Sequence, residues 1–173
     1  MNKKFIVNEK EIKGGPLYID IITNKNELKI KKIEIKDKIH IIGAIKKISA
    51  RIFFQGELTF ISKLTCSLCG KEFQKAIKEK IYTEYIKSLP SLKEKPLKLK
   101  VDELDVEYYN GDFFSIESSI HDTAILAIPF APKCKEDCKG LCPVCGANLN
   151  KVNCGCKVEK YNPLKETVLK LKK

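Results

Sequence analysis

The sequence contains a single arginine, Arg51, among its 33 basic residues. Arginine makes most of the bidentate contacts by which proteins read guanine edges and grip phosphates. A surface that reads nucleic-acid sequence through arginine is therefore excluded. Any nucleic-acid contact would be made by lysine on phosphate, which positions a ligand without reading its sequence.

Hydrophobic runs of export or membrane length are also missing. The apolar stretch in residues 1–7 is far shorter than the hydrophobic part of a signal peptide, and no later window approaches a membrane span. We therefore expect a cytoplasmic protein with no membrane partner. In such a reducing compartment, clustered cysteines bind metal or act in catalysis more often than they form structural disulfides.

Motifs of the common catalytic sites are absent as well. The chain has no phosphate-binding glycine loop, no HExxH, no G-x-S-x-G and no carboxylate pair at a suggestive spacing. Its two histidines, His40 and His121, are isolated, and a lone histidine is more often structural or exposed than a ligand. We predict no catalytic residue and no enzyme activity.

Positive charge, in contrast, is abundant. The chain has 33 Lys and Arg against 22 Asp and Glu, a formal net charge of +11, and such an excess indicates an anionic partner such as nucleic acid. The segment 87–100 has two prolines and five lysines and is predicted to be an exposed basic loop. The lysines predicted to contact RNA lie in this loop and beside the cysteines: Lys93, Lys95, Lys98, Lys100, Lys133, Lys135 and Lys139.

Alternating apolar and charged residues dominate the first part of the chain. The pattern in residues 28–36 and 51–64 is typical of strands with one solvated face. We predict four or five antiparallel strands between residues 16 and 65, with a turn near residues 37–40 and a turn or bulge at Gln55-Gly56. Residues 73–86 fit either a helix or a strand, and their β-branched and aromatic content favours a strand.

The second part of the chain carries a turn signal and two helix patterns. Asn110-Gly111 between aromatic-rich arms is typical of a hairpin turn. Residues 116–128 show helical spacing, with Ser115 able to cap the helix and Pro129 to end it. A short basic helix is predicted over residues 162–173.

These patterns predict an α+β fold. We expect a mostly antiparallel β-sheet or partial barrel with one packed helix, spanning residues 1–130. A small C-terminal cysteine-rich zinc module with the terminal helix would occupy residues 131–173.

The eight cysteines form four close pairs, and pairs at these spacings suit tetrahedral thiolate sites. Two pairs are followed by glycine, as CSLCG and CPVCG, so the chain can turn back and direct backbone N–H groups at the sulfurs. Eight thiols without a nearby histidine predict two closed, structural Zn²⁺ sites.

Four pairs can be joined into two sites in three ways, and the sequence leaves this open. A short loop closes at little entropic cost. This favours one site of Cys142, Cys145, Cys154 and Cys156, and a second of Cys66, Cys69, Cys134 and Cys138. The rival grouping joins the look-alike knuckles CSLCG and CPVCG and leaves Cys134, Cys138, Cys154 and Cys156 for the other ion.

The order of these features resembles the YceD-like family, the large ribosomal RNA subunit accumulation proteins. The resemblance covers the chain from about residue 64 to its end, and GLCPVCGANLN is its most specific part. Its matching segments are TCSLCGKEFQ (65–74), YYNGDFFSIESSIHDTAILAIPFAPKC (108–134), CKGLCPVCGANLN (138–150) and NPLKETVLKL (162–171).

This resemblance implies a non-catalytic factor needed for 23S ribosomal RNA to accumulate during large-subunit biogenesis. The implied partner is ribosomal RNA, a pre-ribosomal particle or a ribosomal protein. Two alternatives stay open at this point: a protein-binding adapter without direct RNA contact, and a thiol redox protein, which would need a metal-free cysteine pair of low pKa.

Overall fold

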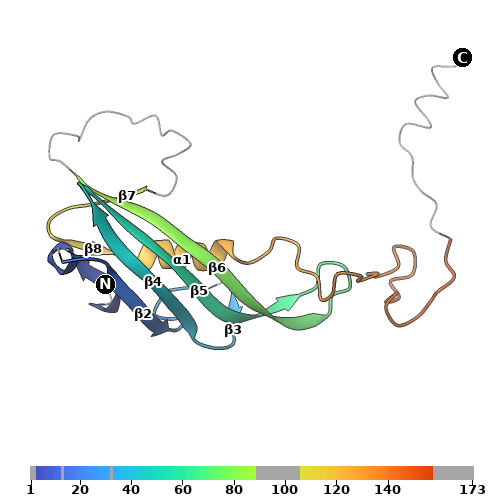
Figure 1. Cartoon of the computed structure of the whole chain (residues 1–173). Helices are drawn as coiled ribbons and strands as arrows, with labels where there is room; N and C mark the ends of the chain where they lie inside the picture. Colours follow the sequence, from blue (N-terminus) through green and yellow to red (C-terminus); the bar gives the residue numbers. More distant parts are fainter. Residues whose placement is uncertain (1–2, 13, 32, 89–105, 158–173) are drawn as a thin grey trace, which may run out of the picture.

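The fold is an open antiparallel sheet with one helix, seen in a computed structural model that describes residues 3–12, 14–31, 33–88 and 106–157 (Figure 1). The helical elements are the 3-10 turns η1 (Lys3–Phe5) and η2 (Glu9–Ile12) and the helix α1 (Glu117–Leu126). The strands are β1 (Ile6–Asn8), β2 (Leu17–Thr23), β3 (Glu34–Ile35), β4 (Ile39–Ile48), β5 (Arg51–Thr65), β6 (Glu72–Lys87), β7 (Val106–Tyr109) and β8 (Phe113–Ser115).

The main sheet has the strand order β2-β4-β5-β6-β7, with β3 also paired to β5. All of its pairs are antiparallel except β6 with β7. Strands β1 and β8 form a separate two-stranded sheet. No pairing among the described strands joins β2 to β7, so the sheet is not a closed barrel; the sequence predicted a sheet or a partial barrel.

The core lies on one face of this sheet. Alternate residues of β5, such as Ile52, Phe54 and Leu58, are completely buried, as the period-two pattern requires. Ile120 and Ala124 of α1 belong to the same buried cluster as these sheet residues, so the prediction that the helix packs on the sheet is confirmed. The contact is also polar, because the hydroxyls of Tyr85 and Ser119 are 2.9 Å apart in the buried interface.

Strands β5 and β6 form a hairpin that extends well beyond the body of the fold (Figure 1). A 15-residue strand spans about 50 Å at roughly 3.3 Å per residue. The ambiguous segment 73–86 is therefore a strand, as its composition favoured. The tip of this hairpin carries the first cysteine pair, which places two thiols far from the core.

One predicted strand is mostly a turn. Among the described residues of 28–36, only those of β3 form a strand, because the Asn24 side chain accepts the backbone N–H groups of Asn26 and Glu27 and starts a turn just before this segment. Leu28 and Ile30 are nevertheless buried in the core. The alternation of apolar and charged residues thus predicted correctly which side chains are buried, but it did not predict the backbone conformation.

The predicted turn or bulge at Gln55-Gly56 is also wrong, since β5 pairs without interruption on both sides. Gly56 faces Gly43 of β4, and a Cβ on Gly43 would lie 2.5 Å from the Gln55 carbonyl oxygen. The glycines are there because the two backbones approach closely.

Asn110-Gly111 does form a turn, with Gly111 at a φ of 77°, but the strands it joins do not make a hairpin. Instead β7 pairs in parallel with β6, and β8 pairs with β1. The turn dipeptide fixed a local reversal, whereas the partners of each strand were decided by the rest of the sheet.

The helix begins one residue later than its predicted range, and the Ser115 hydroxyl accepts the N–H of Glu117 at 3.2 Å. It ends before Pro129. His40 bonds Asp20 and His121 bonds Asp122, so both described histidines have carboxylate partners.

Two predictions lie outside the described residues: most of the basic loop 87–100 and the terminal helix 162–173. The division of the chain at residue 130 stays a prediction. Within the described residues, no helix has the length and apolar character to span a membrane.

Candidate metal centres

The first cysteine tetrad joins the hairpin tip to the chain that follows α1. Cys66 and Cys69 lie in the turn between β5 and β6, and Cys134 and Cys138 come from the later segment. The sulfur atoms of Cys66 and Cys138 are 3.8 Å apart, and those of Cys69 and Cys134 are 3.7 Å apart. All four sulfurs lie within 4.8 Å of one another.

A tight turn positions the two thiols of the hairpin tip. The N–H of Gly70 donates to the Cys66 carbonyl at 2.9 Å, and the N–H of Cys66 donates to the Lys71 carbonyl at 2.9 Å. Gly70 has a φ of 69°, in the region that glycine adopts without strain. The N–H of Ser67 donates to the Pro132 carbonyl at 2.8 Å and so holds the incoming segment against the tip.

The second tetrad, which lies further along the chain, has the other four cysteines. Cys142, Cys145, Cys154 and Cys156 also have all four sulfurs within 4.8 Å of one another. Its knuckle repeats the turn of the first, because the N–H of Gly146 donates to the Cys142 carbonyl at 2.8 Å and Gly146 has a φ of 72°. The look-alike knuckles therefore belong to different tetrads, and the grouping that the short loop favoured is the one present.

A single tetrahedral ion fits the sulfurs of the first tetrad, and the sulfurs of the second lie close enough to share one ion. With Zn–S bonds of about 2.3 Å, a regular tetrahedron has S···S separations of about 3.8 Å, close to the 3.8 and 3.7 Å of the first tetrad. A disulfide would need about 2.05 Å, and all eight cysteines are free. Four sulfurs form the donor set of a site for a soft divalent ion.

Ionisation is uneven within the first tetrad. Burial opposes charge on Cys66, but hydrogen bonds from the backbone N–H groups of Cys134, Cys69 and Leu68 outweigh it, and the pKa of Cys66 falls to about 6. Burial and the neighbouring thiols raise the pKa of Cys134 to about 12. Four adjacent thiolates repel one another, so a bound cation is needed before all four can ionise.

The second tetrad has the same division. Hydrogen bonds from the backbone N–H groups of Cys145 and Val144 lower the pKa of Cys142 to about 6. The thiols of Cys145 and Cys154 raise the pKa of Cys156 to about 12. In both sites the first cysteine of the CxxCG turn has a lowered pKa, and in the first tetrad a hydrogen bond from the backbone N–H of Gly140 also lowers the pKa of Cys138.

Asn150, which lies in the loop of the second tetrad, contacts the first. Its Nδ2 lies 3.4 Å from the Cys138 sulfur, and its Oδ1 accepts the N–H of Lys139 at 3.0 Å. The N–H of Leu141 donates to the Leu68 carbonyl at 3.0 Å. The two tetrads are thus linked by hydrogen bonds and not only by the chain.

The described lysines of the predicted RNA contacts lie beside the first tetrad. Lys133, Lys135 and Lys139 are exposed. Lys133 and Lys135 line a groove of about 490 Å³ together with Lys75 of β6, which the sequence interpretation missed. In the sequence, the only hint of a role for Lys75 was its position nine residues after Cys66. That position becomes meaningful only in the structure, where the segment after α1 docks at the hairpin tip close to Lys75. Lys93, Lys95, Lys98 and Lys100 lie outside the described residues.

A family model described as Large ribosomal RNA subunit accumulation protein YceD matches residues 54–172, which is more than half of the chain. The chain belongs to the YceD family. The family match begins in β5 and contains all eight cysteines. The YceD name links the chain to accumulation of large-subunit ribosomal RNA, as the resemblance implied.

An uncharacterized protein of Mycobacterium leprae (strain TN) is 38% identical to the YceD-family chain over 52 residues. The aligned region covers 30% of this chain and 24% of that protein, so the chain spans about a quarter of the relative's length. No solved structure matches the chain.

Proposed function

We propose that this chain is a non-catalytic cytoplasmic factor for accumulation of large-subunit ribosomal RNA, which it contacts directly through lysines beside the first tetrad. The observation that carries the proposal is the lysine-lined groove where the tail meets β6. The family name supports the ribosomal role, and the groove offers a surface that can bind a phosphate backbone.

Three ammonium groups and one carboxylate line this groove. The ammonium groups belong to Lys75, Lys133 and Lys135, and the carboxylate to Glu136. Of the three lysines, Lys135 forms an ion pair in the described part of the chain, with Asp137 outside the groove at 3.4 Å. Within the described residues Lys75 and Lys133 have no ion-pair partner. Free lysines on a concave surface suit phosphates, and their affinity falls steeply with salt because counterions are released on binding.

Each tetrad would hold one Zn²⁺ ion. Bound there, the ion supplies the positive charge that allows four neighbouring sulfurs to be thiolates. Both tetrads consist of cysteine alone, so neither leaves a coordination position for water or substrate, which supports structural rather than catalytic metal. The first would keep Lys133 and Lys135 docked beside Lys75.

Metal content of the protein purified under reducing conditions, with a thiol count before and after chelation, tests this part. Two zinc ions and thiols that react only after chelation are expected. Absence of metal together with reactive thiols would favour a redox protein instead.

RNA binding is tested by fluorescence anisotropy with a labelled fragment of 23S ribosomal RNA between 50 and 200 mM salt. We expect log affinity to fall linearly with log salt. Replacing Lys75, Lys133 and Lys135 by glutamine should reduce the slope by about two to three units, since each phosphate contact contributes about 0.7 to 0.9.

The matched control replaces the exposed Lys3, Lys10 and Lys46 by glutamine, which removes the same charge at the end of the sheet away from the hairpin tip. Equal losses in both variants would show a diffuse charge effect and no groove. Binding that is absent or insensitive to salt would refute direct RNA contact and favour a protein partner.

A further inference from the structure

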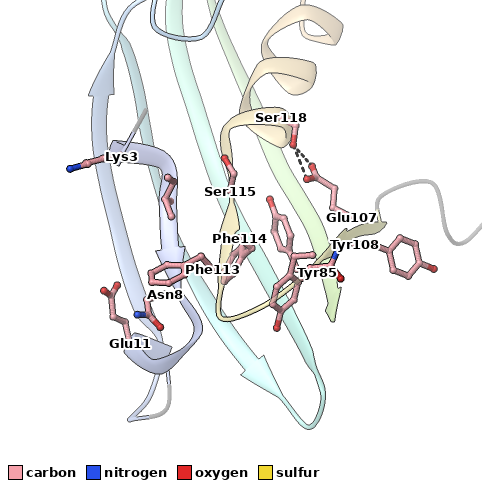
Figure 2. A pocket seen from close by; sticks show the side chains of 13 residues that line it. Lys3, Asn8, Glu11, Tyr85, Glu107, Tyr108, Phe113, Phe114, Ser115 and Ser118 are labelled. Atoms are coloured by element: carbon pink, nitrogen blue, oxygen red, sulfur yellow. Dashed lines mark hydrogen bonds between the residues drawn. The ribbon is translucent and has the colours of Figure 1, made fainter. Parts of the chain in front are cut away.

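A cleft of about 730 Å³ is lined by residues of β7 and β8. These two strands lie at the end of the fold opposite the hairpin tip (Figure 1). The cleft lies between β7, β8, the start of α1 and the segment from η1 to η2 (Figure 2). None of its residues belongs to the tetrads or to the lysine groove, so the inference below does not rest on RNA binding.

Aromatic side chains form much of this cleft. Tyr85, Tyr109 and Phe114 are buried, and the Phe114 ring centroid lies 4.7 Å from that of Tyr85 and 5.4 Å from that of Tyr109. Phe113 and Tyr108 are more than half exposed at the rim. The two exposed rings, Phe113 and Tyr108, offer apolar area and negative π faces, which attract flat or cationic groups.

Glu107 stands on one wall of the cleft with its carboxylate turned toward Ser118 (Figure 2). The Ser118 hydroxyl lies 2.8 and 2.7 Å from its two oxygens. Within the described residues, Glu107 is the one half-buried carboxylate without a lysine or arginine partner. The other half-buried carboxylates, Glu9, Glu27, Glu57, Glu84 and Glu117, each form an ion pair with lysine or arginine.

The surroundings of Glu107 disfavour a negative charge on its unpaired carboxylate. Burial raises the pKa of Glu107, and the nearby charge of Asp122 raises it further. On the opposite wall Glu11 is a second carboxylate, against the single ammonium of Lys3. In a chain of net charge +11, this cleft therefore offers more negative than positive groups.

We infer that the cleft binds an arginine side chain from a basic segment of a partner protein, with the guanidinium on Glu107 and the segment's apolar parts against the aromatic rings. A guanidinium pairs with a carboxylate through two hydrogen bonds and stacks on aromatic faces. Charge complementarity selects this occupant, since a phosphate backbone would meet two carboxylates here.

The probe is the peptide Ac-Gly-Arg-Gly-Arg-Gly-NH₂, titrated into the full-length, metal-loaded protein labelled with ¹⁵N. We expect saturable shifts of the amide signals of Glu107, Phe113 and Ser118. The same peptide with citrulline in place of arginine has nearly the same shape but no charge, and it should bind at least about tenfold more weakly.

Glu107→Gln is expected to weaken binding of the arginine peptide about tenfold, while its amide oxygen can still accept the Ser118 hydroxyl. The control is Glu79→Gln, which removes an exposed carboxylate of β6 that has no ion pair among the described residues; it should leave binding unchanged. Phe113→Ala should weaken binding of both peptides, because it removes aromatic contact area.

Three results would overturn the inference. Equal binding of the arginine and citrulline peptides would mean an apolar site that does not recognise charge. An unchanged affinity of Glu107→Gln would remove the carboxylate from recognition. Larger shifts of the same amides with a mixed-sequence hexaribonucleotide would identify an unpaired base as the occupant. These results are measured on the amide signals of cleft residues, so they can be distinguished from a failure of RNA binding at the lysine groove.

Discussion

The two cysteine tetrads share one knuckle but stand in different surroundings. In both, a CxxCG turn is closed by the same pair of backbone hydrogen bonds, to Cys66 in the first and to Cys142 in the second. Three thiols of the first tetrad are buried, whereas the second exposes Cys145. The same local geometry thus serves one mostly buried site at the hairpin tip and one more exposed site further along the chain.

The tetrads also differ in how much chain each one closes. Residues 70–133 separate the two pairs of the first tetrad, and residues 146–153 separate those of the second. A loop about eight times longer costs roughly 2 kcal/mol more to close. Folding of the hairpin and α1 already brings the two cysteine pairs together, so this entropic cost is part of folding. The first tetrad therefore depends on the tertiary fold, and closing it should in turn raise the free energy of unfolding.

The largest expected effect is a difference in stability between single cysteine mutants of the two tetrads. Cys138→Ser should lower the free energy of unfolding by about 3–5 kcal/mol, comparable to losing a long-loop disulfide, because it opens the link between tail and hairpin. Cys145→Ser should cost less than about 1 kcal/mol, since its site lies outside the core. Urea unfolding followed by far-ultraviolet circular dichroism measures both, and equal losses would erase the distinction.

A second variant probes the contact between the sites. Asn150→Ala should weaken metal binding at the first tetrad by about 10–100-fold, the usual cost of losing a hydrogen bond to a ligand, although Asn150 lies in the loop of the second. Competition with a chromophoric chelator, read together with alkylation of individual cysteines, reports each site.

Its control is Asn153→Ala, which removes the acceptor of the Gly155 N–H at 3.4 Å within the second tetrad's own loop. Cys66 and Cys69 should stay protected in that variant. Deprotection of both tetrads to the same degree in Asn150→Ala would mean that the loop is only generally loosened.

The smallest effect concerns the body of the fold, far from both tetrads. Hydrogen bonds from Lys47 and Lys87 lower the pKa of Glu9 to about 2 from a usual 4.5. Because the folded-state pKa is the lower one, this stabilisation is complete above pH about 4.5 and is lost as the pH falls toward 2.

Glu9→Gln should therefore cost about 1–2 kcal/mol at neutral pH, discounted for the partly exposed lysines. The difference from the wild type should shrink below pH 4.5 and vanish near pH 2. Comparing the two proteins at each pH cancels the effect of acid on the thiolates. If the cysteines of both tetrads stay equally protected from alkylation at neutral pH, the stability of the body is independent of that of the tetrads.

Much of the fold followed from period-two patterning, and the departures share a cause. Alternation indicated the long strands β4 and β5, and composition indicated β6. It did not reveal that Asn24 starts a turn, that Gly43 and Gly56 face each other, or that Asn110-Gly111 joins strands of different sheets. Each of these depends on a side-chain bond or a neighbouring strand that a linear pattern does not contain.

The candidate surfaces divide in the same way. The spacing of the cysteines indicated four thiol pairs, and Lys133 and Lys135 were expected beside them. Lys75 and the aromatic cleft were missed, because their members come from segments far apart in the chain. Glu107 in particular looks like any other surface glutamate until the ion pairs of the remaining carboxylates are known.

The sequence by itself determined the two knuckles, since a CxxCG turn needs only its own backbone bonds and a glycine at positive φ. It also indicated the long strands β4 and β5, because alternate residues along them are apolar. Only the tertiary structure decided that Cys66 and Cys69 meet Cys134 and Cys138, and that Glu107 has no basic partner among the described residues. The physical reason is distance along the chain: local bonds form within a turn, whereas these contacts exist only after the long hairpin, α1 and the tail have packed together.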